Sequence, residues 1–108
     1  MTFAEMLKSR RSIRNYQDKH VSIEIIQEMI KESTLAPNAG NEQPWKFIIV
    51  NNKIMLKTLS DESKQNILAR IAANPDDYAN KYKGLLENES FNVFYNAPCL
   101  VIILGPSN

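Results

Sequence analysis

The sequence has few of the residues that build disulfides and metal centres. It contains one cysteine, Cys99, and one histidine, His20, among 108 residues. A single cysteine cannot form a disulfide within the chain, and a lone histidine without a second ligand candidate nearby does not make a metal site. We therefore expect no metal, a surface position for His20, and a buried, inert thiol at Cys99, which lies in an apolar run.

Net charge and long apolar runs are also scarce. The formal net charge is +1, with 23% charged residues, so no overall field favours nucleic acid or an anionic membrane as a partner. No run approaches the roughly 20 apolar residues of a membrane helix, and the N-terminal segment lacks the apolar core of a secretion signal. The sequence predicts a cytoplasmic protein in which any anion site is local.

The chain is long enough for one small domain, residues 1–108, of which 44% are apolar. Two helices are predicted near its start. Thr2 followed by Glu5 forms a capping box, which predicts a helix from about residue 2 to residue 9. Ser22 can cap a second helix, whose apolar residues recur at helical spacing up to about Leu35. The apolar stripe is wide, so we expect this second helix to be deeply packed.

Two apolar runs, residues 47–50 and 100–104, predict strands buried on both faces. Residues 54–72 between them predict one or two amphipathic helices broken around residues 60–63.

The segment before the second strand is less regular. Residues 76–89 are highly polar and predict either a surface helix or a mobile flap. Phe91, Phe94 and Tyr95 form an aromatic patch, for which core packing is expected over a stacking site.

A basic cluster follows the first helix. Arg10, Arg11 and Arg14 lie within five residues of one another, and Ser12 adds a hydroxyl. A guanidinium can hold phosphate oxygens through two parallel hydrogen bonds, so the cluster could bind a phosphate. Alternatively, it is a solvated basic turn that is favourably placed at a helix C-terminus.

The loop that precedes the first strand is rich in proline and amide side chains. Asn38, Asn41 and Gln43 offer hydrogen-bond donors and acceptors, and Trp45, the only tryptophan, adds a large apolar face. Such a loop could hold a flat ligand with a polar edge. Alternatively, it is a turn between helix and strand whose amides satisfy their own backbone.

Three segments resemble the FMN-dependent nitroreductase family. The loop sequence PNAGNEQPWKF matches the family pattern at Pro37, Asn41, Gln43, Pro44 and Trp45. RRSIRNY, which contains the basic cluster, resembles the family's flavin-binding entry segment, and NAPCLVIILG resembles its next core strand. The resemblance implies an α+β fold, an α/β sandwich of the nitroreductase type, in which helices pack around a small central sheet.

The resemblance also implies an activity and partners. The enzyme would be an oxidoreductase that passes hydride from NAD(P)H through FMN to nitroaromatic or quinone-type acceptors. FMN would carry the chemistry, so no side chain is expected to be catalytic. In the family the flavin lies at a homodimer interface, where the loop of one subunit covers the flavin of the other. A homodimer is therefore expected.

The same resemblance assigns residues to the cofactor. Arg10 would contact the FMN phosphate, Arg11 and Ser12 the phosphate or ribityl chain, and Arg14 the pyrimidine edge, where a fixed cation stabilises the reduced, anionic flavin. The full set expected to bind the cofactor is Arg10, Arg11, Ser12, Arg14, Pro37, Asn38, Ala39, Asn41 and Gln43. Asn38 and Ala39 replace two small, often serine, positions of the family.

The resemblance covers essentially the whole chain but only the first half of a typical nitroreductase. We therefore expect a single nitroreductase-like domain that lacks the family's C-terminal half. A second hypothesis follows from this, in which the chain is a non-catalytic half-domain that acts only through association. An anion-binding or nucleic-acid-binding module is a weaker alternative, because one basic cluster in a nearly neutral chain is a small footprint.

Overall fold

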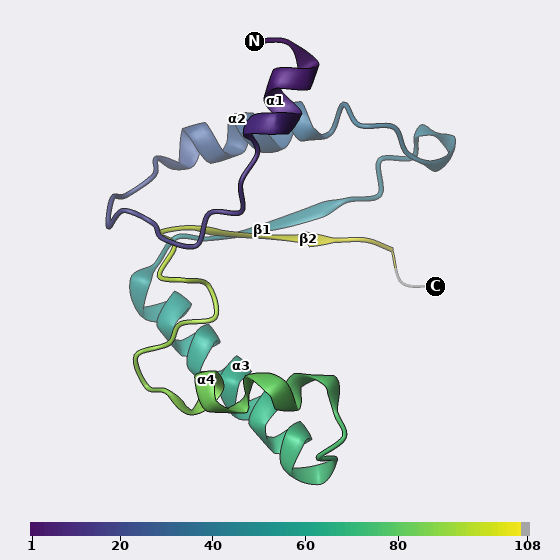
Figure 1. Cartoon of the computed structure of the whole chain (residues 1–108). Coiled ribbons are helices and arrows are strands. Elements are labelled where there is room, and N and C mark those ends of the chain that lie inside the picture. Colours follow the sequence, from purple (N-terminus) through teal and green to yellow (C-terminus); the bar gives the residue numbers. More distant parts are fainter. Residues whose placement is uncertain (107–108) are drawn as a thin grey trace.

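The computed structural model describes residues 1–106, and these form helices around a small two-stranded sheet. The elements in chain order are α1 (Phe3–Ser9), α2 (Ile23–Ser33), a 3₁₀ turn η1 (Ala39–Asn41), β1 (Lys46–Val50), α3 (Lys53–Ala73), a 3₁₀ helix η2 (Tyr78–Tyr82), α4 (Lys83–Glu87) and β2 (Leu100–Leu104). Figure 1 shows α1 and α2 on one side of the sheet and α3 and α4 on the other. The expected α+β class is confirmed.

Both predicted helix caps in the first third of the chain are confirmed. The Thr2 hydroxyl accepts a hydrogen bond from the Glu5 amide at 3.1 Å, and the Glu5 carboxylate accepts one from the Thr2 amide at 2.8 Å. These bonds satisfy donors that the first turn of α1 would otherwise leave unpaired. Ser22 likewise accepts from the Ile25 amide at 3.3 Å and begins α2.

The expectation that α2 is deeply packed is wrong. The helix contains no buried residue, and Ile25 and Met29 on its apolar stripe are 54% and 57% exposed. Helical periodicity identifies which face is apolar, but it does not supply an element to cover that face. No helix among residues 1–106 is long and apolar enough to cross a bilayer.

The two predicted strands pair in an antiparallel sheet, with Phe47 opposite Ile103 and Ile48 opposite Ile102. Residues opposite each other point to the same face, so apolar side chains lie on both faces of this sheet. The expected burial of both faces is wrong, because Ile48 is 46% and Ile103 is 64% exposed. Two strands alone leave each face only partly covered.

A single continuous helix, α3, follows β1, so the predicted break around residues 60–63 is wrong. Asn52 caps its start by accepting from the Met55 amide at 3.0 Å. Ser60, where the break was expected, is fully buried and accepts a hydrogen bond from the Val93 amide at 3.0 Å. The polar residue is therefore a buried contact of α3 and does not end the helix.

The core lies on the α3 side of the sheet. Ile71 on α3, Ala79 on η2 and Leu86 on α4 form a buried cluster, against which Ile67, Leu68 and Phe91 pack. The polar segment 76–89 thus folds as η2 and α4 against α3. Phe91 packs on this core, as expected for part of the aromatic patch, and its ring meets that of Tyr95 edge-on at 5.9 Å.

Candidate functional site

The basic cluster lies in an extended segment directly after α1, and all its side chains are exposed. Arg11 donates from Nη1 to the carbonyl oxygens of Lys8 and Arg10 at 2.9 and 2.8 Å. Its guanidinium therefore also caps the C-terminal end of α1, as the alternative interpretation of the cluster predicts. Arg10 makes one contact of 3.4 Å from Nη1 to the Ser12 hydroxyl.

Charge in this segment is not neutralised locally. Among residues 1–106, no ion pair joins Arg10, Arg11 or Arg14 to a carboxylate. Three exposed guanidiniums without carboxylate partners, next to a hydroxyl, form a donor set suited to phosphate oxygens. The residues present therefore fit the phosphate-bearing cofactor that the resemblance implies.

The loop that follows α2 is held by its own amide side chains. The Asn38 carbonyl Oδ1 accepts a hydrogen bond from the Gln43 backbone amide at 2.8 Å, and Gln43 Nε2 donates to Asn41 Oδ1 at 3.3 Å. Gly40, Asn41 and Gln43 adopt left-handed backbone, with φ of 64°, 53° and 50°. The amides therefore fix a strained turn, and strain of this kind in a non-glycine residue costs about 1–3 kcal/mol.

The two candidate segments are separated in this chain. The basic cluster precedes α2 and the amide loop follows it (Figure 1), and among residues 1–106 no hydrogen bond or ion pair joins them. The structure thus brings Arg10, Arg11 and Ser12 into contact, with no hydrogen bond from Arg14 to them among residues 1–106, and separately assembles Asn38, Asn41 and Gln43. It does not place all the expected residues around one pocket.

A cavity of about 520 Å³ lies elsewhere, between α3 and the residues before β2. Leu56 and Phe91 line it, and Tyr16 and Asp18 reach it from the segment after the basic cluster. An ion pair of 2.6 Å between Lys53 and Asp18 holds that segment to the start of α3. None of the residues expected to bind the cofactor lines this cavity.

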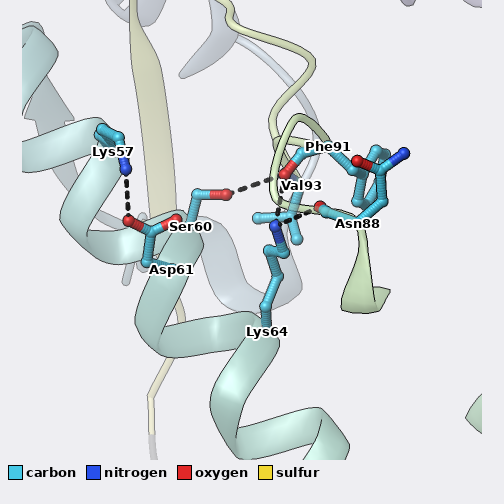
Figure 2. A network of polar contacts seen from close by, with 7 residues as sticks. All are labelled: Lys57, Ser60, Asp61, Lys64, Asn88, Phe91 and Val93. Carbon is cyan, nitrogen blue, oxygen red and sulfur yellow. Dashed lines mark hydrogen bonds and ion pairs between the residues drawn. The ribbon is translucent and has the colours of Figure 1, made fainter. Parts of the chain in front are cut away.

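Figure 2 shows the contacts that hold one wall of this cavity, and sequence reasoning missed them. Lys64 is only 7% exposed and donates from Nζ to the carbonyl oxygens of Asn88 and Phe91 at 2.9 and 2.7 Å. One helical turn earlier, Ser60 binds the Val93 amide. We call Ser60 and Lys64 with the residues 88–93 that they hold the loop clamp. The sequence feature that could have indicated these contacts was a serine and a lysine on the inner face of a predicted amphipathic helix.

Asp77 and Cys99, both outside the candidate site, have pKa values shifted from their ordinary ones. A hydrogen bond from the Ala79 amide, together with the Arg70 guanidinium at 2.8 Å, lowers the pKa of Asp77. Burial raises the pKa of the Cys99 thiol, which is half-buried rather than buried as expected. A raised pKa favours the thiol over the reactive thiolate. His20 is exposed, which confirms its expected position.

Solved structures define the fold class. A BluB-like flavoprotein of Clostridium difficile 630 superposes with a TM-score of 0.69 at 29% identity, and the match covers 95% of this chain and 48% of that one. A nitroreductase with bound FMN from Bacteroides fragilis gives a TM-score of 0.73 at 25% identity, and the match covers 93% of this chain and 50% of that one. The fold is that of the nitroreductase-like α+β proteins.

Sequence comparison assigns the family. A model of the nitroreductase family matches residues 7–107, and the chain belongs to that family. An Archaeoglobus fulgidus protein with the provisional name NADH dehydrogenase/NAD(P)H nitroreductase is 42% identical over 83 residues, which cover 72% of this chain and 48% of that protein. Mouse iodotyrosine deiodinase 1 is 29% identical over 105 residues, which cover 94% of this chain and 36% of that protein. The chain spans about half or less of the length of these relatives.

Proposed function

We propose that the chain is an FMN-dependent oxidoreductase of the nitroreductase type. In this function it passes hydride from NAD(P)H through the flavin to nitroaromatic or quinone-type acceptors. Family membership supports an oxidoreductase, and the names of relatives and of similar structures support NAD(P)H and FMN. The observation that carries the proposal is the basic cluster, whose three arginines have no carboxylate partner among residues 1–106.

FMN would supply the hydride chemistry, and the side chains of this protein would bind and orient it. Arg10 and Ser12 already share a contact, so they can hold phosphate oxygens together. Arg11 would add charge while it caps α1. Arg14 would hold a positive charge at the pyrimidine edge, where it stabilises the reduced form electrostatically.

The amide loop would serve a second subunit. Pro37, Asn38 and Ala39 lie apart from the basic cluster of their own chain, which supports a role at the cofactor of a partner in a homodimer. In this arrangement Asn41 and Gln43 would hold the loop in the shape that faces the partner's cofactor. Their side chains hydrogen-bond each other, and Asn38 already fixes the turn through the Gln43 amide. A cytoplasmic location completes the proposal.

The test is the absorbance spectrum of the purified chain, followed by FMN titration monitored by quenching of flavin fluorescence. We expect yellow protein, or tight FMN binding by colourless protein, and at least tenfold weaker binding by Arg10→Ala. Arg70→Ala is the matched control, because Arg70 lies on α3 outside the basic cluster. A colourless chain that neither binds FMN nor gains thermal stability from it would contradict the proposal.

A second candidate function is favoured by the length comparison. The chain covers only about half of the relatives and structures that it matches, so it could act as a non-catalytic half-domain through association alone. NADH and NADPH oxidation assays with menadione or nitrofurazone separate the two functions. Turnover by the FMN-loaded chain supports the enzyme, whereas FMN-independent association without turnover supports the half-domain.

A further inference from the structure

The segment that carries Arg14 has very few contacts to hold it in place. Residues 13–21 lead from the basic cluster to α2 without regular secondary structure, and residues 13–20 are exposed. Among residues 1–106, the ion pair between Asp18 and Lys53 is the one hydrogen bond or ion pair that this segment makes. Its oxygen and nitrogen lie 2.6 Å apart. Because Arg14 lies four residues before Asp18, its position relative to the rest of the chain depends on this pair.

The other end of the ion pair is well anchored. Lys53 is the first residue of α3, the helix that carries the core, and the Asn52 side chain caps this helix end by accepting from the Met55 amide. Figure 1 shows the segment between α1 and α2 reaching the level of the sheet on the side where α3 begins. The pair therefore joins an otherwise unattached segment to the best packed element of the chain.

The start of α3 favours a carboxylate from elsewhere in the chain. Its first turn contains no acidic residue, although the N-terminal end of a helix dipole is stabilised by negative charge. One turn after Lys53 stands Lys57, and like charges at this spacing repel each other. Lys57 is paired with Asp61 at 2.7 Å within the helix. Asp18 supplies the corresponding negative charge to Lys53.

Tyr16 adds an apolar contact to the ion pair. Its ring lines the cavity of about 520 Å³ together with Leu56 and Phe91, and Asp18 and Lys53 line the same cavity. Tyr16 is 43% exposed, the lowest value among the large apolar residues of the first twenty positions. The side chains at positions 16 and 18 thus face α3, whereas Arg14 does not line the cavity and stays available to a ligand.

We propose that Asp18, Lys53 and Tyr16 are positioning residues of the basic cluster, which hold its segment on α3 and fix the position of Arg14. They act through Arg14 and do not touch the cofactor. The inference rests on the proposed function for the identity of the ligand, FMN. Both side chains of the ion pair are largely exposed, at 72% and 76%, so its loss should weaken FMN binding by about two- to fivefold.

Asp18→Asn is the decisive variant, because positioning and simple charge predict opposite results. Removing a negative charge near an anion site strengthens anion binding if charge alone matters, whereas loss of the ion pair should weaken it. Asp61→Asn is the matched control, since it removes the same charge from the same cavity and breaks a pair within α3. We expect fluorescence titration with FMN to show weaker binding by Asp18→Asn and no weakening by Asp61→Asn.

Reversing the ion pair tests whether the contact itself is responsible. Asp18→Lys combined with Lys53→Asp should restore FMN affinity to within about twofold of the parent, and Asp18→Lys alone should not. The reduction potential of bound FMN is a second readout. It should be more negative in Asp18→Asn and return in the reversed pair, because the charge of Arg14 stabilises the reduced flavin only from a fixed position.

A measurement without FMN separates failure of this inference from failure of the proposed function. The ¹⁵N heteronuclear NOE of the Arg14 and Tyr16 amides reports their order on the nanosecond timescale. It should be lower in Asp18→Asn than in the parent and recover in the reversed pair. If it does so while the parent chain binds no FMN, the positioning stands and the cofactor assignment fails.

Two results overturn the inference and leave the cofactor assignment intact. One is FMN binding by Asp18→Asn that equals or exceeds that of the parent chain. The other is an unchanged heteronuclear NOE at Arg14 in Asp18→Asn, whatever the affinity for FMN.

Discussion

The ammonium of Lys64 lies 2.7 Å from the carbonyl oxygen of Phe91, although 27 residues separate them in the sequence. The same ammonium donates to Asn88 and lies 6.0 Å from the centre of the Phe91 ring. A cation held by two carbonyls and an aromatic face satisfies backbone acceptors that an irregular loop would otherwise leave unpaired. Lys64 therefore joins the segment before β2 to α3.

Replacing Lys64 tests the strength of the loop clamp. Lys64→Met should lower the free energy of unfolding by about 2 kcal/mol, because it removes two charge-assisted hydrogen bonds from a largely buried group. Lys57→Met on the same helix breaks an exposed ion pair with Asp61 and should cost less than about 0.5 kcal/mol. Urea unfolding of both variants measures the difference, and equal losses would count against the clamp.

Two neighbouring leucines of α4 test the position of the core. Leu86 is 6% exposed and Leu85 is 45% exposed. Leu86→Ala should destabilise the chain by about 2–5 kcal/mol, because it removes buried methyl groups and leaves a cavity. Leu85→Ala should cost less than about 1 kcal/mol. Thermal unfolding followed by circular dichroism provides the comparison, and a larger loss at Leu85 would place the core elsewhere.

The backbone of the amide loop depends on one glycine. Gly40 has a φ of 64°, a conformation that side chains with a Cβ rarely adopt. Gly40→Ala should therefore cost about 1–2 kcal/mol. Gly105→Ala is the matched control, because a Cβ there meets no atom within 4 Å. Chemical unfolding of the purified chain is the measurement, and an unchanged free energy of unfolding for Gly40→Ala would show that the turn can relax.

Arg10 and Arg14 of the basic cluster should act on different steps, FMN binding and flavin reduction. Arg10→Ala should weaken FMN retention at least tenfold, because it removes a phosphate contact. Arg14→Ala should slow flavin reduction more than it weakens FMN binding, because its charge acts most strongly on the reduced form. Stopped-flow reduction and FMN titration of both variants provide the two readouts. Equal losses of affinity with unchanged reduction rates would refute this division.

Stability should depend on the charge of Asp77 in acid. Its pKa is lowered in the folded chain by the Ala79 amide and by Arg70, so the unfolded chain takes up a proton first as the pH falls. The contribution is complete above the ordinary value of 3.8 and is lost as the pH falls through the folded value. Asp77→Asn should thus be less stable than the parent at neutral pH, and the gap should narrow towards pH 2.

The adjacent Asp76→Asn is the control for this experiment, since Asp76 is exposed. Chemical unfolding at a series of pH values between about 2 and 7 gives the two curves. A constant gap between Asp77→Asn and the parent over this range would contradict a role for the Asp77 charge.

Local signals in the sequence predicted local structure well. The Thr2 and Glu5 pair, the Ser22 cap and the two strands depend on residues that are close in sequence, and all were found. The continuity of α3 through Ser60 could not be predicted, because its partner Val93 lies 33 residues away. A serine in a helix favours a break only when its hydroxyl competes locally for the backbone.

Burial was the property that sequence predicted least well. The stripe of α2 and the strands have the composition of core elements, yet within residues 1–106 nothing encloses them. Composition describes the environment in which a side chain is stable, and this environment need not come from the same chain. For the candidate site, the sequence located the basic cluster and the amide loop, but the hydrogen bonds within each segment required the structure.

The open sheet has a consequence for the chain at high concentration. Among residues 1–106, β1 and β2 pair only with each other, and the run Leu100–Leu104 carries no charge. Uncharged strands with unpaired outer edges can add further strands without limit, as in fibrils. In the homodimer proposed above, pairing with one copy would close the assembly, whereas edge-to-edge stacking with many copies would not. The yield of dimer would then depend on the competition between these two reactions, and slow mixing at low protein concentration would favour the closed product.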